Sequence, residues 1–303
     1  MLEKLRAEAK IHNNKLVMLP IKRLYDLQKE LEEFRDTEEL NGFQQWILSD
    51  IYKFDLPEVD FTVNSLILVA VPHPIYVDVT LHYQGKSYQT KGLGVSDMTM
   101  TCAYITKVVS EAGHQVQEIG HFPLKRLAVQ SGLATYGRNN ITYVDEYGSN
   151  ISYIAFVSDA MSEEDTWRPM CHAQMCDNCT LCLSACPTGA IRPDRFLINN
   201  EICLSCLNEG GGEFPDWLPK DVHHTIYDCL RCQEKCPMNL KVKDPNEIIQ
   251  TLDISEEETE MLLAGKRKED FPEEFIKRTD MIGLFAWDVT LSRNIRAIIE
   301  ANA

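Results

Sequence analysis

Residues 176–190 read CDNCTLCLSACPTGA, which places four cysteines within eleven positions and a proline directly after the last of them. The chain contains 11 cysteines, and all except Cys102 and Cys171 lie between residues 176 and 236. A secreted disulfide scaffold spreads its cysteines through a short chain, whereas this clustering is typical of metal ligation in a reducing compartment. We therefore expect a metal centre in this segment.

The spacing C-x2-C-x2-C-x3-C-P of the first run is the ligand pattern of bacterial ferredoxins. A second run, C-x2-C-x3-C-P at 229–237, is incomplete, because Ile226 stands where its first cysteine would be. In two-cluster ferredoxins the fourth cysteine of a run binds the neighbouring cluster. Either Cys203 or Cys206 then has to supply the missing ligand of the second run.

Four cysteines of the first run, three of the second run and one of Cys203 or Cys206 provide eight thiolates, which is enough for two [4Fe–4S] clusters. One cluster is predicted to use Cys176, Cys179, Cys182 and Cys236. The other is predicted to use Cys186, Cys229, Cys232 and one of Cys203 or Cys206. Structural zinc is the alternative, since paired C-x2-C motifs also form zinc ribbons. The two C-x3-C-P endings favour iron–sulfur clusters. Cys102 is expected to be a buried, inert thiol, and Cys171 receives no role.

The net charge and the N-terminal sequence bear on whether the protein binds nucleic acid or membranes. The 303-residue chain carries 30 Lys and Arg against 46 Asp and Glu, a formal net charge of −16. Nucleic-acid binders present basic surfaces, so extended nucleic-acid binding is not expected. The N-terminal MLEKLRAEAK has no apolar signal core, and the longest apolar run, LILVAV at 66–71, has the length of a strand. We expect a cytoplasmic protein that does not contact membranes.

Hydrophobic patterns predict an α+β fold. Residues 1–56 read as mainly helical, 65–74 as a buried strand ended by two prolines, 77–90 as a hairpin around Gly85, and 98–113 as a helix. Residues 140–160 read as two strands around a turn at Gly148. We predict three segments: an α/β body with a helical N-terminus at 1–165, a double-cluster domain at 166–243, and a helical C-terminal segment at 244–303.

Residues 123–160 resemble the segment that precedes the double cluster in epoxyqueuosine reductases and reductive dehalogenases. The matching positions are Ser131-Gly132-Leu133, Gly137-Arg138-Asn139 and Tyr147-Gly148-Ser149. The PTGAI extension of the first cysteine run, the CLRCQEKCPMN ending and the late Arg293-Asn294 are similar too. The likeness is firm over 123–240, and it favours Cys203 over Cys206 as the eighth ligand.

This resemblance implies a cobalamin held in a nitroreductase-like α/β domain beside the clusters. A low-potential ferredoxin or flavodoxin would supply electrons, and a small molecule or a modified nucleoside would be reduced. The residues implied to line the cofactor are Gly132, Leu133, Tyr136, Gly137, Arg138, Asn139, Tyr143, Gly148 and Ser149. Backbone N–H groups of the glycines would bond the corrin amides, and Arg138 would anchor a propionamide or phosphate. Turn formation and a surface arginine are the alternatives.

The family also uses an acidic residue that protonates the substrate. An ungapped alignment from Gly132-Leu133 places it at Glu118, where the family has aspartate. A glutamate serves as a general acid if burial raises its pKa. His121 is the alternative proton donor, and both residues are otherwise ordinary loop residues.

The sequence therefore predicts a cobalamin- and [4Fe–4S]-dependent reductase that resembles epoxyqueuosine reductase. One alternative is an electron-transfer protein that reduces a corrinoid or flavin held by a partner, with the α/β body as its docking surface. Another alternative is a non-catalytic iron–sulfur scaffold or sensor. The cysteine runs fit all three hypotheses, and the segment at 123–160 favours the first.

Overall fold

The computed structural model describes residues 1–73, 76–194, 196–240, 242 and 250–302. The chain forms two compact units. The first unit comprises Met1–His73 and Ser96–Cys179, and the second comprises Pro74–Val95 and Thr180–Ala303. The predicted division into functional segments stays a prediction, and its boundary at 243/244 lies outside the described residues.

A four-stranded antiparallel sheet forms the centre of the first unit, in the order β1-β2-β8-β5. Its strands are β1 (Lys15–Pro20), β2 (Ser65–Pro72), β8 (Ile151–Ser158) and β5 (Val116–Ile119). Strand β2 is buried along Ser65–Val71, which confirms the strand predicted from its continuous apolar run. Strand β1 is the short apolar segment between the first two helices, in a region that is otherwise mainly helical, as expected.

Helices cover this sheet with the apolar stripes that the sequence predicts. The helices of the first unit are α1 (Leu2–Ile11), α2 (Lys22–Thr37), α3 (Gly42–Trp46), α4 (Thr99–Glu111) and α5 (Leu124–Gln130), with a π-turn at Ile47–Ile51. Leu2, Leu5 and Ala9 of α1 join residues of α4 and the sheet in one buried core. Helix α5 packs against β2 and β8. Leu24, Leu27 and Leu31 of α2, which recur at helical spacing, are also buried.

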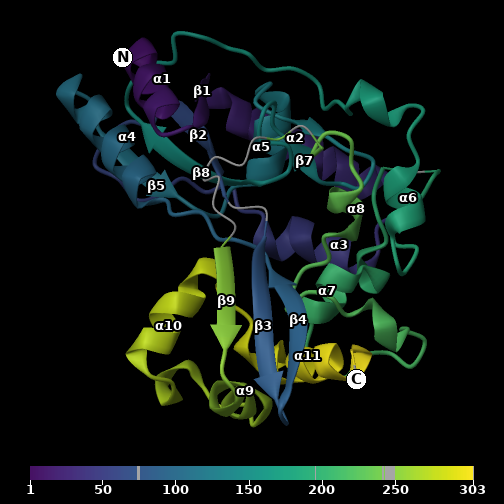
Figure 1. Ribbon diagram of the computed structural model, residues 1–303. Helices are drawn as coiled ribbons and strands as arrows, with labels where there is room; N and C mark the ends of the chain where they lie inside the picture. Colours follow the sequence, from purple (N-terminus) through teal and green to yellow (C-terminus); the bar gives the residue numbers. More distant parts are fainter. Residues whose placement is uncertain (74–75, 195, 241, 243–249, 303) are drawn as a thin grey trace. The chain divides into compact units, whose positions relative to one another are not determined.

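A three-stranded sheet in the order β4-β3-β9 lies in the second unit. Strands β3 (Val77–Tyr83) and β4 (Lys86–Gly92) form the predicted hairpin, and Gln84 and Gly85 both have positive φ at its turn, as a type I′ turn requires. Strand β9 (Gln250–Ile254) pairs in parallel with β3, which lies between β9 and β4 in Figure 1. The hairpin thus packs with the C-terminal part of the chain.

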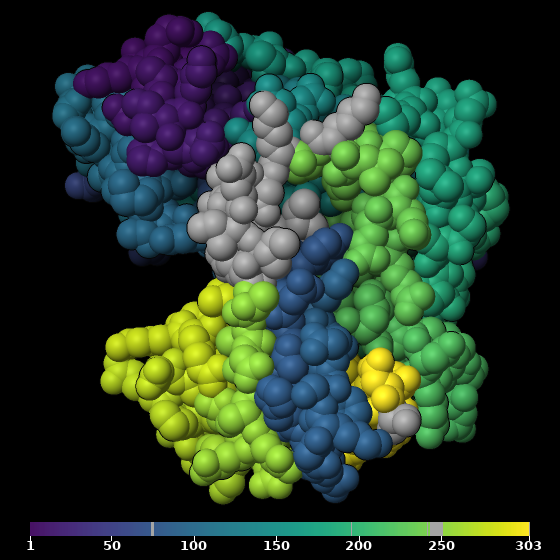
Figure 2. Space-filling model, in the orientation of Figure 1, coloured from purple at the N-terminus to yellow at the C-terminus, as the bar shows by residue number. Residues whose placement is uncertain are grey.

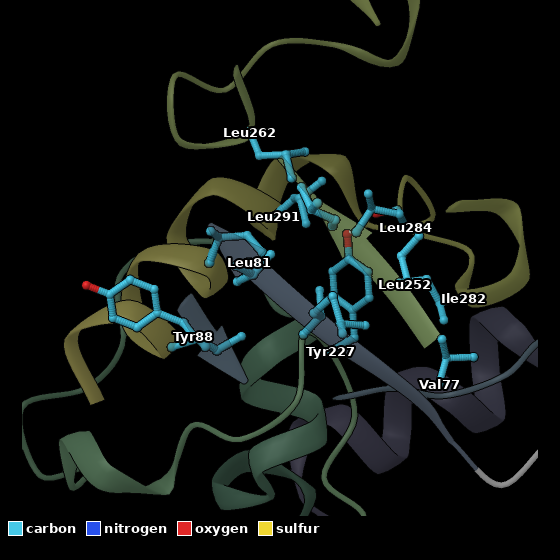
Figure 3. Close-up of a cluster of buried hydrophobic side chains, with 14 of the residues drawn as sticks. Val77, Leu81, Tyr88, Tyr227, Leu252, Leu262, Ile282, Leu284 and Leu291 are labelled. Atoms are coloured by element: carbon cyan, nitrogen blue, oxygen red, sulfur yellow. Dashed lines mark hydrogen bonds between the residues drawn. The ribbon is translucent and has the colours of Figure 1, made fainter. Parts of the chain in front are cut away.

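The C-terminal helices complete the core of the second unit. They are α9 (Glu256–Leu263), α10 (Glu273–Thr279) and α11 (Asp288–Ala301). Their apolar side chains pack with Val77, Leu81 and Tyr88 of the hairpin (Figure 3). Tyr227, from the cysteine-rich segment, enters the same core, and its hydroxyl donates to the carbonyl of Leu284. The helical C-terminal segment is therefore built into the second unit.

The cysteine-rich segment consists of short helices and loops. Its α-helices are α6 (Leu181–Ala185), α7 (Leu204–Glu209) and α8 (Arg231–Glu234), and α6 contacts α8. Three short 3-10 turns occur at Gln174–Cys176, Asn200–Ile202 and Lys220–Val222, and two more follow at Lys268–Asp270 and Asp280–Ile282. One small core of Leu204, Leu218 and Val222 lies under this segment. So small an apolar core suits a segment that metal ligation stabilises.

None of the described helices combines the length and the apolar character needed to cross a bilayer.

Candidate metal centre

A two-stranded hairpin stands next to the first cysteine run within the first unit. It is formed by β6 (Thr135–Tyr136) and β7 (Thr142–Tyr143). In its turn, the N–H of Gly137 donates to the carbonyl of Ile141 at 2.8 Å, and the N–H of Asn140 donates back to Gly137 at 3.0 Å. The Asn139 amide donates to the Tyr143 hydroxyl at 2.9 Å. These contacts make the Gly-Arg-Asn motif a closed turn, which we call the 135–143 hairpin.

The 135–143 hairpin holds the backbone of the first cysteine run. Tyr136 exchanges backbone hydrogen bonds with Cys171 (3.3 Å) and Ala173 (2.8 Å). The Arg138 guanidinium donates to the carbonyl of Cys176 at 2.6 Å and to that of Cys179 at 3.3 Å. The backbone N–H of Arg138 also points at the Cys176 sulfur, 3.4 Å away. Hydrogen bonds to ligand sulfurs are one determinant of the reduction potential of a cluster, so this hairpin is placed to position and tune a cluster ligand.

The three predicted cofactor-lining glycines use their backbone N–H groups within the chain. Gly132 donates to Val129 at 3.1 Å, and Gly148 donates to Val144 at 2.8 Å; Gly137 bonds Ile141 as described above. Gly132 and Gly148 have φ of 82° and 59°, which glycine adopts without strain. Turn formation therefore accounts for the glycines, and the expected bonds from these N–H groups to corrin amides are not supported.

The other predicted cofactor residues lie in the same region. Tyr136, Asn139, Tyr143 and Ser149 are buried, while Leu133 is half-buried. Burial raises the pKa of the Tyr136 hydroxyl, which therefore stays protonated. Because Arg138 contacts the cysteine run, its expected anchoring of a propionamide or phosphate receives no support. Assignment of this group to a cofactor stays a prediction.

Replacement of Gly137 by alanine is expected to destabilise the 135–143 hairpin. A Cβ atom at this position would lie 2.6 Å from both the Asn139 side-chain oxygen and Cε2 of Tyr143. Overpacking of this kind costs about 1–3 kcal/mol, and urea denaturation would measure the loss. Gly120→Ala is the matched control in the same unit, because a Cβ there meets no atom within 4 Å. Equal unfolding free energies for the two variants would contradict this account of Gly137.

In the second unit, Cys203 and Cys206 lie at the start of α7 and within its first turn. The hydrogen bond from the Cys206 thiol lowers the pKa of Cys203 to about 6, assisted by the backbone N–H groups of Cys206 and Ser205. The same bond raises the pKa of Cys206. A thiolate is the form that binds metal. The two thiols are therefore hydrogen-bonded to each other at the start of α7, and the choice of Cys203 as the eighth cluster ligand stays a prediction from the resemblance.

Helix α7 also contacts the start of the second cysteine run. The N–H of Cys229 donates to the Ser205 hydroxyl at 2.8 Å. The buried Asn208 amide donates to the carbonyls of Tyr227 (2.5 Å) and Asp228 (3.0 Å). Burial raises the pKa of the Cys229 thiol to about 12, so a bound cation would be needed to keep it deprotonated. Hydrogen bonds thus hold two predicted ligand segments of one cluster together.

The late Arg293-Asn294 pair on α11 fixes the other side of α7. The Arg293 guanidinium donates to four carbonyls, those of Leu207 (2.8 Å), Asn208 (3.0 Å), Gly210 (2.8 Å) and Gly212 (2.5 Å). The Asn294 amide donates to the carbonyls of Asn208 (2.9 Å) and Ile226 (2.8 Å). The pair therefore connects the C-terminal helix to the loops that carry Cys203 and Cys229.

The described cysteines carry no disulfide, since all 11 are free thiols. Among the described residues, no three His, Cys, Asp or Glu side chains gather around one point as ligands of a single ion would. A [4Fe–4S] cluster is bound by four thiolates at four separate iron atoms, so its ligands do not gather around one point. The prediction of clusters is therefore unaffected. Cys176 and Cys179 belong to the first unit and the other predicted ligands to the second. Ligation of the first cluster stays a prediction from the spacing.

The two predicted proton donors lie on the surface of the first unit. Glu118 of β5 is exposed and accepts a hydrogen bond from the Cys102 thiol at 3.4 Å. Burial, followed by this bond, raises the pKa of Cys102 to about 11, so the thiol is protonated and inert, although it is only half-buried. His121 is exposed, and its Nε2 lies 3.0 Å from the Asp55 carbonyl. The burial that a glutamate acid requires is absent at Glu118, and both catalytic roles stay predictions.

Two supporting residues were not found from the sequence. Arg168, in the Trp-Arg-Pro linker, donates to the carbonyls of Val129 (3.2 Å) and Ala134 (3.0 Å) and so holds the turn at Gly132. Ser205 bonds Cys229, as described. Arg168 and Ser205 both form hydrogen bonds with backbone groups that are distant in the sequence. In the sequence, only their position near a motif could have indicated this role.

Comparison with known proteins places the cysteine-rich segment in a described domain class. Residues 175–239 match the family model "4Fe-4S double cluster binding domain". The epoxyqueuosine reductase of Bacillus subtilis (strain 168) is 32% identical over 128 residues, which make up 42% of this chain and 31% of that protein. The aligned part thus spans about a third of the relative's length.

Solved structures share the fold. An epoxyqueuosine reductase from Streptococcus thermophilus aligns with a TM-score of 0.60 and 19% identity over 100% of this chain and 81% of that chain. A crystal structure of epoxyqueuosine reductase with a tRNA-Tyr epoxyqueuosine-modified tRNA stem loop aligns with a TM-score of 0.59 and 18% identity over 99% and 81%. The resemblance and the mixed α/β fold with a double-cluster domain are confirmed, while the nitroreductase-like detail stays a prediction.

Proposed function

We propose that this chain is an iron–sulfur oxidoreductase of the epoxyqueuosine reductase type, which carries two [4Fe–4S] clusters and reduces a substrate with low-potential electrons. The match of residues 175–239 to a double-cluster domain carries this proposal. The ligands would be Cys176, Cys179, Cys182 and Cys236 for one cluster, and Cys186, Cys203, Cys229 and Cys232 for the other. Bound clusters of this kind supply one-electron transfer over a wide range of potentials.

The residues of this chain would position and tune the clusters. The 135–143 hairpin fixes the backbone at Cys176 and Cys179 through Arg138, and Arg293 fixes the loop after Cys206. A ferredoxin or flavodoxin type of donor fits a chain that takes up single electrons. Free thiols on this scale persist in a reducing compartment, which supports a cytoplasmic location.

The proposal has two forms, which differ in the group that accepts the electrons from the clusters. Resemblance to epoxyqueuosine reductases supports a cobalamin bound by this chain. The hydrogen bonds of Gly132, Gly137 and Gly148 favour a second candidate function, in which the chain reduces a corrinoid or flavin held by a partner. Because the glycine N–H groups do not fit the expected corrin contacts, we assign no step to a corrinoid on these residues.

The proposed substrate is a modified nucleoside or a small molecule. A nucleoside within a tRNA stem loop is the first substrate to test, since one neighbour of this fold was crystallised with such a stem loop. The net charge of −16 argues against extended nucleic-acid binding, so a free nucleoside is the second substrate to test.

Anaerobic purification followed by iron, sulfide and cobalt analysis tests the proposal. Two clusters predict about eight iron and about eight sulfide per chain. Cobalt bound after reconstitution with cobalamin, together with reduction of an epoxyqueuosine-modified stem loop by a low-potential donor, would establish the first form of the proposal. Eight iron without cobalt, with rapid electron transfer to a partner, would establish the second. Zinc in place of iron would overturn both.

A further inference from the structure

We propose that the second unit contains a binding site for a small phosphorylated sugar or polyol, in an open pocket beside the second cysteine run. The pocket has a volume of about 590 Å³, within the usual range for small-molecule sites. It is lined by residues of β3, β4, α6, α8 and the loop before Cys229: Asp78, Gln89, Thr90, Lys91, Ser184, Ala185, His224, Arg231, Glu234 and Lys235. This site goes beyond the proposed function, which uses none of these side chains.

Cationic groups outnumber carboxylates around the pocket. Three lining residues carry a positive charge and two a negative charge, so the local balance is 3 − 2 = +1 in a chain whose net charge is −16. Lys91 pairs with Glu234 at 3.2 Å and lies 4.5 Å from the centre of the Tyr76 ring. In Figure 2 the blue β3–β4 hairpin lies against the green residues of the cysteine-rich segment. The pocket is therefore a locally basic site on an acidic chain.

His224 contributes a buried acceptor that has no partner. Its Nδ1 lies 2.8 Å from the Val222 carbonyl, and a carbonyl only accepts, so the proton is on Nδ1 and Nε2 carries a lone pair. Burial lowers the pKa of His224, which keeps the ring neutral. Nε2 is buried without a hydrogen bond to any described residue. An orphaned buried acceptor is costly; because His224 lines the pocket, we infer that a ligand hydroxyl donates to Nε2 when the site is occupied.

Arg231 and Lys235 supply cations that are free to bind an anion. Arg231 Nε lies 3.4 Å from Nδ1 of His224, but it cannot donate to a nitrogen that already carries a proton. Neither the guanidinium of Arg231 nor the ammonium of Lys235 forms an ion pair with the described residues. A planar guanidinium with an adjacent ammonium matches the oxygens of a phosphoryl group.

These groups together define the class of ligand. A phosphoryl group would bind Arg231 and Lys235, while hydroxyl groups would donate to His224 Nε2 and to the carboxylate of Asp78. Inorganic phosphate would bind only the two cations, Arg231 and Lys235. An uncharged sugar would donate hydrogen bonds only to the acceptors, His224 Nε2 and the Asp78 carboxylate. A phosphorylated sugar or polyol satisfies both, and a ligand of hexose phosphate size suits the volume of the pocket.

Isothermal titration calorimetry on the anaerobically purified full chain tests this inference, with glucose 6-phosphate, glucose and inorganic phosphate as probes. We expect glucose 6-phosphate to bind about tenfold or more tightly than either other probe. Arg231→Gln and Lys235→Gln should each weaken binding of both phosphate-bearing probes by about tenfold. His224→Phe should weaken glucose 6-phosphate alone, because it removes the acceptor for a hydroxyl.

Arg192→Gln serves as the control, since Arg192 pairs with Asp194 in the same unit and does not line the pocket. The iron content of each variant shows whether the cysteine segment is intact, and Lys235, which is exposed, provides a variant that should not affect folding. Absence of heat with about 10 mM glucose 6-phosphate, a concentration that reveals even weak binding, would overturn the proposal. Unchanged affinity in both cation variants would do the same. Equal binding of phosphate and glucose 6-phosphate would refute the sugar part.

Discussion

Cys203→Ser is expected to lower the iron content from about eight to about four atoms per chain, the loss of one [4Fe–4S] cluster. The resemblance assigns Cys203 as the eighth ligand, and the hydrogen bond from Cys206 lowers the pKa of its thiol. Serine provides a much poorer ligand to iron. Iron and sulfide analysis, with the electron paramagnetic resonance signal of the reduced protein, would measure the loss.

Cys206→Ser is the matched control, because Cys206 lies one helical turn away and the same hydrogen bond raises its pKa. This variant should keep about eight iron atoms. Cys102→Ser is a second control in the first unit, where burial keeps the thiol protonated. Loss of a cluster in Cys206→Ser, with full iron in Cys203→Ser, would reverse the assignment of the eighth ligand.

Asn294→Ala is expected to lower the free energy of unfolding by about 2–4 kcal/mol. Its side chain is 1% exposed, and its amide donates to the carbonyls of Asn208 and Ile226. Alanine would leave the Ile226 carbonyl without this donor and would remove the Asn294 side-chain oxygen that accepts from Arg293, while the Asn208 carbonyl keeps its bond from Arg293. Each of the two losses costs about 1–2 kcal/mol. Urea denaturation of the anaerobic protein would measure the change, and iron content would show whether the Cys203 and Cys229 loops still bind a cluster.

Asn302→Ala is the control for this variant. Asn302 lies just past the end of the same helix, α11, and donates a single hydrogen bond to the Ile298 carbonyl at 2.8 Å. Because its side chain is exposed, its loss should cost about 0.5 kcal/mol or less. A small effect of Asn294→Ala, similar to that of the control, would show that the Asn294 side chain does not contribute to holding α7 and the Ile226 loop.

Much of the local structure could be predicted from single features of the sequence. The continuous apolar run at 65–72 gave β2, and the alternating pattern around Gly85 gave the hairpin of β3 and β4. Strand β1 was not predicted as a strand, because a short apolar segment between two helices fits both the helical period and the strand period. Parallel pairing of β9 with β3 joins segments more than 170 residues apart, and no local pattern predicts such a contact.

At the candidate site, the motif Gly137-Arg138-Asn139 likewise shows what the sequence predicts and what it leaves to the tertiary structure. Its residue types were recognised, and its expected contacts with a corrin stay a prediction, whereas its contacts within the chain come from the structure. Arg138 binds the carbonyls of Cys176 and Cys179, and the space beside Gly137 is filled by Asn139 and Tyr143. Sequence likeness identified an important segment, whereas its physical task depended on which groups lie next to it.

The sequence alone predicted the double-cluster segment, because its C-x2-C spacings and C-x3-C-P endings follow the ligand pattern of bacterial ferredoxins; residues 175–239 match a 4Fe-4S double-cluster domain. It also determined the apolar faces of the helices, which follow from the helical period. The tertiary structure alone decided that the β3–β4 hairpin joins the second unit, and that Arg293 and Asn294 support the cysteine loops. Those side chains bind backbone carbonyls, which every residue type carries, so their partners leave no signature in the sequence.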